Sequence, residues 1–236
     1  MNDKGCLYLI PSPLGENDPR EVIPAPVLER LSSLHIFVVE ELRTARRYLS
    51  RAGLKGHIEE LEFHVLNEHT PEPEVEALAD LFTDGRDVGL ITEAGLPAVA
   101  DPGAALVALC HRRGIRVVPF VGPSSLMMAL MASGLNGQSF AFQGYLPAKT
   151  EERGSAIKTL ERQSAVHRQT QIFIETPYRN DAMFQDLLRC CAPLTRLCIA
   201  ANITMPDETI LTRTISQWRK EPLTIGKRPC VFMILA

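Results

Sequence analysis

Polar residues that could bind a ligand or move a proton stand in loops directly after predicted strands. Glu93 follows an apolar run and has no helix-capping role that the sequence suggests. Ser124 and Ser125 follow Gly122-Pro123 at a predicted helix start, where hydroxyls and free backbone N–H groups either bind a ligand or cap the helix. The loop at 11–15 carries two prolines and a glycine, which free its carbonyl groups for a ligand or form a plain rigid turn.

Basic residues recur at helical spacing. Arg43, Arg47 and Arg51 stand four residues apart and therefore share one face of a predicted helix. Lys149 and Arg153 form a second spaced pair. A solvated surface explains such faces, and contact with the phosphates of a partner is the alternative.

Alternating strands and helices are predicted to position these loops. Apolar runs bounded by turn residues predict strands at 6–10, 35–39, 88–92, 115–120, 140–143, 171–175, 197–203, 209–214 and 230–235. Helical patterns occur at 26–34, 42–52, 74–82, 101–113, 126–133, 151–165 and 181–191.

The order of these elements predicts an α/β protein with two domains. The strands at 88–92 and 115–120 flank a helix, so they should be parallel. Asp101 is predicted to be the N-cap of that helix, with Pro102 as its first residue. We expect residues 1–120 to form a domain with a parallel sheet and residues 121–236 a domain with a mixed sheet. No Gly- or Ser-rich linker separates them, which favours tightly packed domains with a cleft between them.

Composition excludes several classes of protein. The 236 residues are 45% hydrophobic and 22% charged with a net charge of −3, so neither a disordered chain nor a generally basic nucleic-acid coat is indicated. The six cysteines form no C-x-x-C pair, which predicts free thiols and no metal site. The first apolar run is too short for a signal peptide, and no stretch could cross a membrane; we expect a cytoplasmic protein. The common dinucleotide, P-loop, zincin and hydrolase motifs do not occur.

Six blocks of sequence together resemble one family over nearly the whole chain. They are Y-L-I-P-S-P-L-G at 8–15, V-E-E-L-R-T-A-R-R-Y-L at 39–49, T-E-A-G-L-P-A-V-A-D-P-G at 92–103, V-G-P-S-S at 121–125, Q-G-Y-L-P-A-K at 143–149 and E-T-P-Y-R at 175–179. The chain is similar to the tetrapyrrole methylase superfamily of S-adenosylmethionine-dependent methyltransferases. Within it, the chain resembles the branch that methylates the 2′-hydroxyl of a cytidine in small-subunit ribosomal RNA.

The resemblance implies two α/β domains with S-adenosylmethionine in the cleft between them, and a homodimer. It also implies the residues of the cofactor pocket, which are Pro11, Gly95, Leu96, Val99, Ser124, Ser125, Met128, Thr176 and the backbone near Asn202 and Ile203.

The chain departs from that branch at three places. The branch has Glu-Asp-Thr-Arg where this chain has Glu40-Glu41-Leu42-Arg43, and Ser-Asp-Ala-Gly-Thr-Pro where this chain has 92–97. A late Arg-Glu-Leu-Thr-Lys becomes 201–205, with the loss of two cations and a carboxylate. Three hypotheses follow: a methyltransferase of RNA, a methyltransferase of a small molecule such as a tetrapyrrole, and a non-catalytic cofactor-binding protein that acts as a regulator.

Methyl transfer from a sulfonium requires alignment and exclusion of water, but no metal and no covalent nucleophile. A hydroxyl acceptor would also lose a proton, for which Glu93 and Glu40 are the candidate bases; their alternative role is hydrogen bonding to the loop backbone. Arg43 and Arg179 are candidates to orient an anionic substrate, and Lys149 and Arg153 would extend a basic path for RNA.

Overall fold

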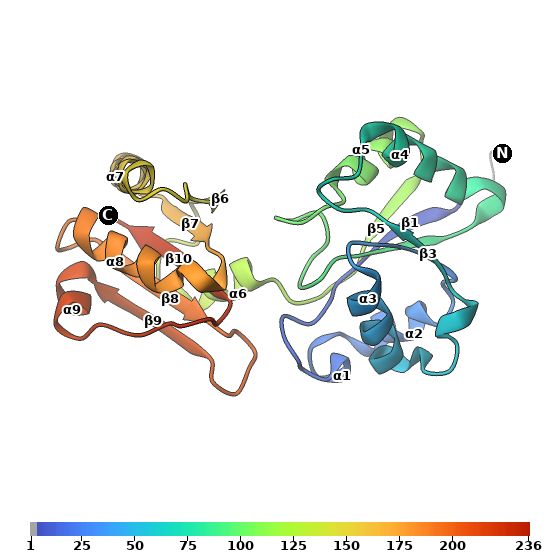
Figure 1. The fold of residues 1–236 in the computed structure, drawn as a ribbon, viewed down its shortest axis with the longest axis horizontal. Helices are drawn as coiled ribbons and strands as arrows, with labels where there is room; N and C mark the ends of the chain where they lie inside the picture. The colour runs from blue at the N-terminus through green and yellow to red at the C-terminus, as the bar shows by residue number, and fades with distance from the viewer. Residues whose placement is uncertain (1–3) are drawn as a thin grey trace. The chain divides into compact units, whose positions relative to one another are not determined.

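The computed structural model of the protein describes residues 4–236. The chain divides into two compact units, one that ends at Ser124 and one that spans Ser125–Ala236, and each is described by itself (Figure 1). Both units are α/β structures, so the predicted fold class is confirmed. The predicted domain boundary at residues 120 and 121 stays a prediction.

The first unit contains a parallel five-stranded sheet. Its strands are β1 (Cys6–Ile10), β2 (Ile36–Val39), β3 (Glu62–Val65), β4 (Val88–Ile91) and β5 (Arg116–Pro119), in the order β3-β2-β4-β1-β5. Strands β2 and β4 are buried along their whole length, as expected for a sheet with helices on both faces. Because all five strands run in one direction, the loops that follow them meet at one edge of the sheet.

Helices cover both faces of this sheet. One face packs against α4 (Glu72–Ala77), the 3-10 segment Leu78–Gly85 and α5 (Ala104–Arg112). The other packs against α2 (Ala25–Leu31) and α3 (Leu42–Leu49), which continues into a π-helical turn, Ser50–Leu54. Two short segments, α1 (Pro19–Val22) and a 3-10 turn at Ile58–Glu60, complete the unit.

The start of α5 differs from the prediction. The helix begins at Ala104 with Gly103 as its N-cap, so Asp101 is not the N-cap. Ala98 and Ala100 have φ values of 64° and 63°, and Gly103 has a φ of 124°. These left-handed residues carry the chain through an irregular loop past Asp101 before helical geometry can begin.

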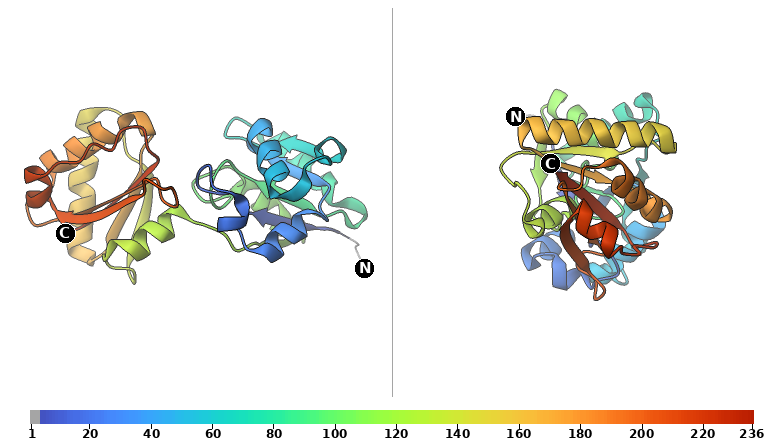
Figure 2. Two further views of the ribbon diagram at one scale, coloured as in Figure 1. Left: turned by 90° about the horizontal axis from the view of Figure 1, so that it is seen from below. Right: turned by 90° about the vertical axis from the view of Figure 1, so that its left-hand side faces the viewer.

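The second unit contains a mixed five-stranded sheet with the order β6-β7-β10-β8-β9. Its strands are β6 (Phe140–Tyr145), β7 (Thr170–Ile174), β8 (Arg196–Ala201), β9 (Thr209–Thr214) and β10 (Cys230–Leu235). β6 and β7 are parallel and the other pairs are antiparallel. Three helices, α7 (Thr150–His167), α8 (Asn180–Cys190) and α9 (Ile215–Lys220), pack against the face that carries Phe173 and Phe232 (Figure 2). The remaining helix, α6 (Ser125–Ser133), contacts β8, β9 and β10.

Strand register brings three loops of the second unit to one edge. Val231 pairs with Ile174 and Cys230 pairs with Ala201, so the start of β10 lies between the ends of β7 and β8. The segments that follow Ile174, follow Ala201 and precede Cys230 are therefore neighbours.

The cysteines of the described residues are all free thiols, as predicted. Residues 4–236 contain no group of three or more metal-ligating side chains placed to hold an ion. No helix among these residues is long and apolar enough to cross a membrane.

Candidate functional site

The loops after β1 and β4 are joined backbone to backbone. Ser12 N–H donates to the Gly95 carbonyl at 2.8 Å, and Gly95 N–H donates to the Ser12 carbonyl at 3.1 Å. The Ser12 hydroxyl also donates to the Thr92 carbonyl at 3.0 Å. Gly95 has a φ of 74°, which L-residues with a side chain rarely adopt. The two loops therefore form one rigid edge rather than two independent turns.

Pro11 is held from two sides. The buried Tyr48 hydroxyl donates to the Pro11 carbonyl at 2.8 Å, and burial raises the pKa of Tyr48. Gly122, in the loop after β5, lies directly against the proline ring: a Cβ atom on Gly122 would be 2.1 Å from the Pro11 Cβ. A Cβ atom on Gly95 would be 3.6 Å from the Pro123 carbonyl oxygen. Three loops that sequence analysis singled out, after β1, β4 and β5, thus lie together in the first unit.

Backbone strain is concentrated in two of the segments predicted to bind the cofactor. Among the described residues, six non-glycine residues have positive φ. Ala98 and Ala100 belong to the loop of Gly95, Leu96 and Val99, and Asn202 and Thr204 flank Ile203. Strained backbone is found preferentially at ligand sites, where surrounding structure holds it in place.

Three acidic side chains lie close together beside the Ser12–Gly95 edge. A Glu40 carboxylate oxygen accepts the Glu93 backbone N–H at 3.2 Å, and a Glu93 carboxylate oxygen accepts the Thr44 hydroxyl at 3.4 Å. Burial raises the pKa of Glu40, and the negative charges of Asp101 and Glu93 raise it further. Burial likewise raises the pKa of Asp101, with Glu93 adding to the effect. The Glu93 side chain is exposed, whereas Glu40 holds the loop backbone.

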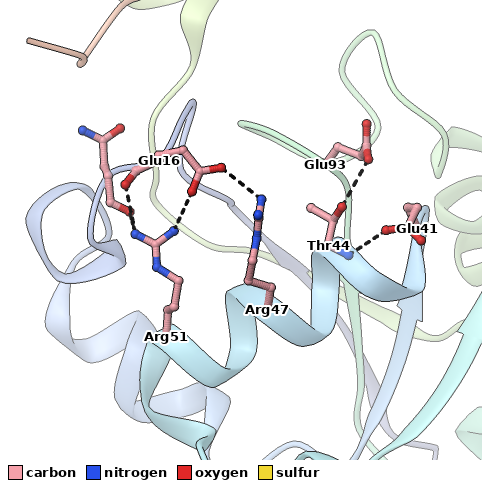
Figure 3. Close-up of polar contacts among 7 residues, drawn as sticks. Glu16, Glu41, Thr44, Arg47, Arg51 and Glu93 are labelled. Atoms are coloured by element: carbon pink, nitrogen blue, oxygen red, sulfur yellow. Dashed lines mark hydrogen bonds and ion pairs between the residues drawn. The ribbon is translucent and has the colours of Figure 1, made fainter.

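Glu16 binds two arginines, Arg47 of α3 and Arg51 of the π-helical turn that follows it (Figure 3). Glu16 pairs with Arg47 at 3.0 Å and with Arg51 at 3.4 Å, and Arg51 also donates to the Glu16 and Asn17 carbonyls. Arg43 is exposed and forms no ion pair with any described residue. It lines an open hollow of about 580 Å³ with Glu41, Thr44 and Arg47. Arg43 is therefore the arginine of this face whose charge is available to a substrate.

The segment after β7 contains a buried carboxylate. One oxygen of Glu175 accepts from the Thr176 N–H at 2.7 Å and from the Arg179 Nε and Nη2 at 3.0 and 2.6 Å. The other oxygen, Oε2, is buried and has no hydrogen-bond partner among the described residues. Asn202 lies at the same edge of the sheet, because its N–H donates to the Pro229 carbonyl. The structure thus brings Thr176, Asn202 and Ile203 to one edge.

The remaining predicted residues are distributed as follows. Leu96 and Met128 are half-buried, and Val99 is exposed. Ser124 ends the first unit and Ser125 is the first residue of α6. Lys149 is exposed and pairs with Glu152.

The structure corrects the RNA-binding role predicted for Arg153. Its side chain is 4% exposed, and its guanidinium binds Asp186 of α8 and the Ala148 carbonyl. A buried, fully engaged guanidinium cannot contact an external polyanion, so Arg153 is a structural residue.

Sequence reasoning missed Glu16 and Lys227. Glu16 lies 31 residues from Arg47 in the sequence, and no local pattern links an acid to a base at that distance. Lys227 places its ammonium 4.9 Å from the ring centroid of Tyr178, again through a contact that only folding creates.

Comparisons with known proteins identify relatives of this chain. Residues 20–218 match the model of the tetrapyrrole (corrin/porphyrin) methylases. The ribosomal RNA small subunit methyltransferase I of Vibrio cholerae is 31% identical over 209 residues, which cover 89% of this chain and 68% of the relative. The protein of that name in Escherichia coli O157:H7 is 30% identical, over 99% of this chain and 78% of its own length.

Solved structures agree on the fold. Uroporphyrin-III C-methyltransferase from Thermus thermophilus, complexed with S-adenosyl homocysteine, superposes with a TM-score of 0.58 at 19% identity, over 98% of this chain and 97% of that one. The methyltransferase CobJ gives a TM-score of 0.61 at 16% identity, over 98% and 94%.

Proposed function

This chain belongs to the tetrapyrrole (corrin/porphyrin) methylase family, and we propose on that basis that it is an S-adenosylmethionine-dependent methyltransferase of small-subunit ribosomal RNA. The observation that carries the proposal is the packing of Pro11, Gly95 and Gly122, which joins three strand-end loops into one edge of the parallel sheet. Loops at such an edge are where α/β proteins bind ligands.

The residues present fit the cofactor. S-adenosylmethionine carries hydroxyl and amine donors, and the buried Glu175 Oε2 is an acceptor without a partner. We propose that the cofactor is bound by the pocket residues that the family resemblance implies, among which Thr176, Asn202 and Ile203 lie beside Glu175 at one edge of the second unit. When bound, the cofactor supplies an electrophilic methyl carbon on a sulfonium.

The protein's own groups align the acceptor and handle its proton. Glu93 is the exposed carboxylate of the acidic cluster and is proposed to take the proton of a ribose hydroxyl. Glu40 is a positioning residue, because its carboxylate holds the Glu93 backbone. Arg43 and Arg179 are proposed to bind RNA phosphates, since both guanidinium groups remain partly or fully exposed.

RNA is preferred over a small planar substrate because the relatives at about 30% identity are named for ribosomal RNA. The likeness to uroporphyrin methyltransferases is 19–20% identity and concerns the fold. Action on ribosomal RNA supports the proposal of a cytoplasmic enzyme. The family resemblance is the ground for proposing a homodimer, which light scattering on the purified protein would test.

Two measurements test the proposal. Calorimetric titration with S-adenosylmethionine should show micromolar binding that Ser124→Ala/Ser125→Ala weakens and that Ser32→Ala/Ser33→Ala, a matched pair of exposed serines, leaves unchanged. Purified small ribosomal subunits should then accept label from the methyl-labelled cofactor. Cofactor binding without labelling of RNA or of any small molecule in a cell extract would favour a non-catalytic regulator, and no binding at all would overturn the methyltransferase.

A further inference from the structure

Tyr178 is the most exposed aromatic side chain of the described residues, with 80% of its surface accessible. It lies in the 3-10 turn Pro177–Arg179. The Lys227 ammonium is positioned 4.9 Å from the centroid of its ring, a cation–π arrangement. An exposed aromatic ring beside a cation offers a flat surface on which an aromatic ligand can stack.

The turn that carries Tyr178 is rigid. Glu175, buried in front of it, accepts two hydrogen bonds from Arg179 and one from the Thr176 N–H. The Arg179 N–H closes the turn on the Thr176 carbonyl at 2.9 Å. These hydrogen bonds fix the backbone on both sides of Tyr178, so its ring is held in solvent by an ordered turn.

The loop that carries Lys227 is fixed by hydrogen bonds to the start of α8, which directly follows this turn. The fully buried Asn180 donates to the Gly226 and Arg228 carbonyls at 3.2 and 2.7 Å. The Asp181 carboxylate accepts from the Ile225 N–H at 2.8 Å and from the Gly226 N–H at 3.2 Å. Two residues at the start of α8 therefore fix the backbone on both sides of Lys227.

The charge of Lys227 is available for a ligand. Lys227 forms no ion pair with any described residue. The neighbouring Arg228 guanidinium, in contrast, donates to two carbonyls of its own loop, to the Asp207 carbonyl between β8 and β9, and to the Thr209 hydroxyl. The pair also lies at the edge where β7 ends and β10 begins, the edge that holds Thr176, Asn202 and Ile203.

We propose that Tyr178 and Lys227 form a stacking platform for a base of single-stranded RNA next to the methylated nucleotide. The inference rests on the proposed function and adds an RNA contact to it. The Lys227 ammonium lies over one face of the exposed Tyr178 ring, which leaves the other face for an unpaired base: the ring stacks on the base and the ammonium contacts its phosphate. Because both loops are already ordered, binding would cost little conformational entropy.

The test uses the full chain and a short fluorescein-labelled oligocytidine RNA at low salt, with anisotropy as the readout. Tyr178→Ala should weaken binding about tenfold or more, the loss expected for one stacked base, and Tyr178→Phe should retain most of it. Lys227→Ala should weaken binding and lower the salt dependence, while Lys158→Ala on α7 serves as a matched control for an exposed lysine. An RNA that contains 2-aminopurine should be quenched by the wild type and not by Tyr178→Ala.

Calorimetry with S-adenosylmethionine distinguishes a failure of the stacking platform from a failure of the proposed methyltransferase function. Unchanged cofactor binding in Tyr178→Ala, with the loss confined to RNA, supports the platform. RNA binding that is equal in wild type and Tyr178→Ala overturns the platform and leaves the methyltransferase intact. A wild type that binds neither oligocytidine nor ribosomal subunits overturns both, and an equal loss in Tyr178→Ala and Tyr178→Phe would indicate a hydroxyl contact instead of stacking.

Discussion

The Glu93 backbone N–H donates to the Glu40 carboxylate at 3.2 Å, which links the end of β2 to the loop after β4. The Glu40 carboxylate thereby fixes the position of the Glu93 backbone, and the Glu93 carboxylate stays exposed. The two glutamates were predicted as alternative bases, but in the structure they have different environments, because only Glu40 is used to hold backbone.

Glu40 should make stability depend on pH. Burial and neighbouring acids raise the pKa of Glu40 above its ordinary 4.5 in the folded protein, so between these two values the folded state binds more protons than the unfolded state. Stability should therefore fall as pH rises from about 4.5 through the raised pKa. Urea unfolding at a series of pH values should show a smaller fall for Glu40→Gln than for the wild type. A parallel fall in both proteins would contradict this assignment.

Gly122→Ala should damage the site through packing alone. The new Cβ atom would lie 2.1 Å from the Pro11 Cβ, so one of the two loops must move. We expect a loss of about 1–3 kcal/mol in unfolding free energy together with weaker cofactor binding. Gly137→Ala is the control, since its Cβ atom would meet nothing within 4 Å. Wild-type stability and cofactor affinity in Gly122→Ala would show that the Pro11 loop is free to shift.

Arg153→Ala should lower the stability of the second unit, and it should not remove a contact with RNA. It would leave the buried Asp186 with only the Arg189 guanidinium as a partner; breaking a buried pair outright costs about 3–5 kcal/mol, so we expect a loss at the lower end of that range. Lys149→Ala, at an exposed pair four residues earlier, should change stability by less than about 1 kcal/mol. Chemical denaturation measures both. A stable Arg153→Ala protein with impaired RNA binding would restore the role predicted from the sequence.

Strands were predictable where buried residues form an apolar or alternating run in the sequence. Cys6–Ile10, Thr209–Thr214 and Cys230–Leu235 are strands with the predicted bounds, because apolar or alternating runs end at turn residues there. β3 was missed, since its four residues, Glu62–Val65, include a charged residue and are not fully buried. Its place at the sheet edge follows from pairing with β2 and not from its own sequence.

The loops of the candidate site were predictable from the sequence, but their contacts were not. The composition of the loops at 11–15 and 92–103 is typical of ligand-binding loops and of rigid turns, whereas the hydrogen bonds between Ser12 and Gly95 join residues far apart in the chain. Helical periodicity correctly places Arg153 on a helix, but it carries no information about Asp186, which lies opposite on α8. The predicted start of α5 was wrong for a related reason. The backbone of the preceding loop, and not the capping tendency of Asp101, decides where the helix begins.

Arg43→Ala should reduce RNA affinity without affecting the cofactor. Its guanidinium is exposed and unpaired among the described residues, so its loss removes about one phosphate contact and should lower the slope of log affinity against log salt by about one. Arg46→Ala on the same helix is a suitable control, because Arg46 is paired with Glu59. Anisotropy titrations at several salt concentrations test this, and an unchanged slope would remove Arg43 from the substrate face.

Glu93→Gln tests whether the exposed carboxylate of the acidic cluster is a general base. The amide keeps the size of the side chain and its acceptor for the Thr44 hydroxyl, but it cannot take a proton. General-base catalysis contributes about 10²–10⁴-fold, so kcat for methylation of small ribosomal subunits should fall by that factor while cofactor affinity and stability stay near wild type. Glu41→Gln is the matched control, since Glu41 accepts the Thr44 N–H and caps α3 from the same edge. A loss confined to KM would make Glu93 a positioning residue. An unchanged kcat would mean that alignment of the acceptor is sufficient and that its proton leaves to water.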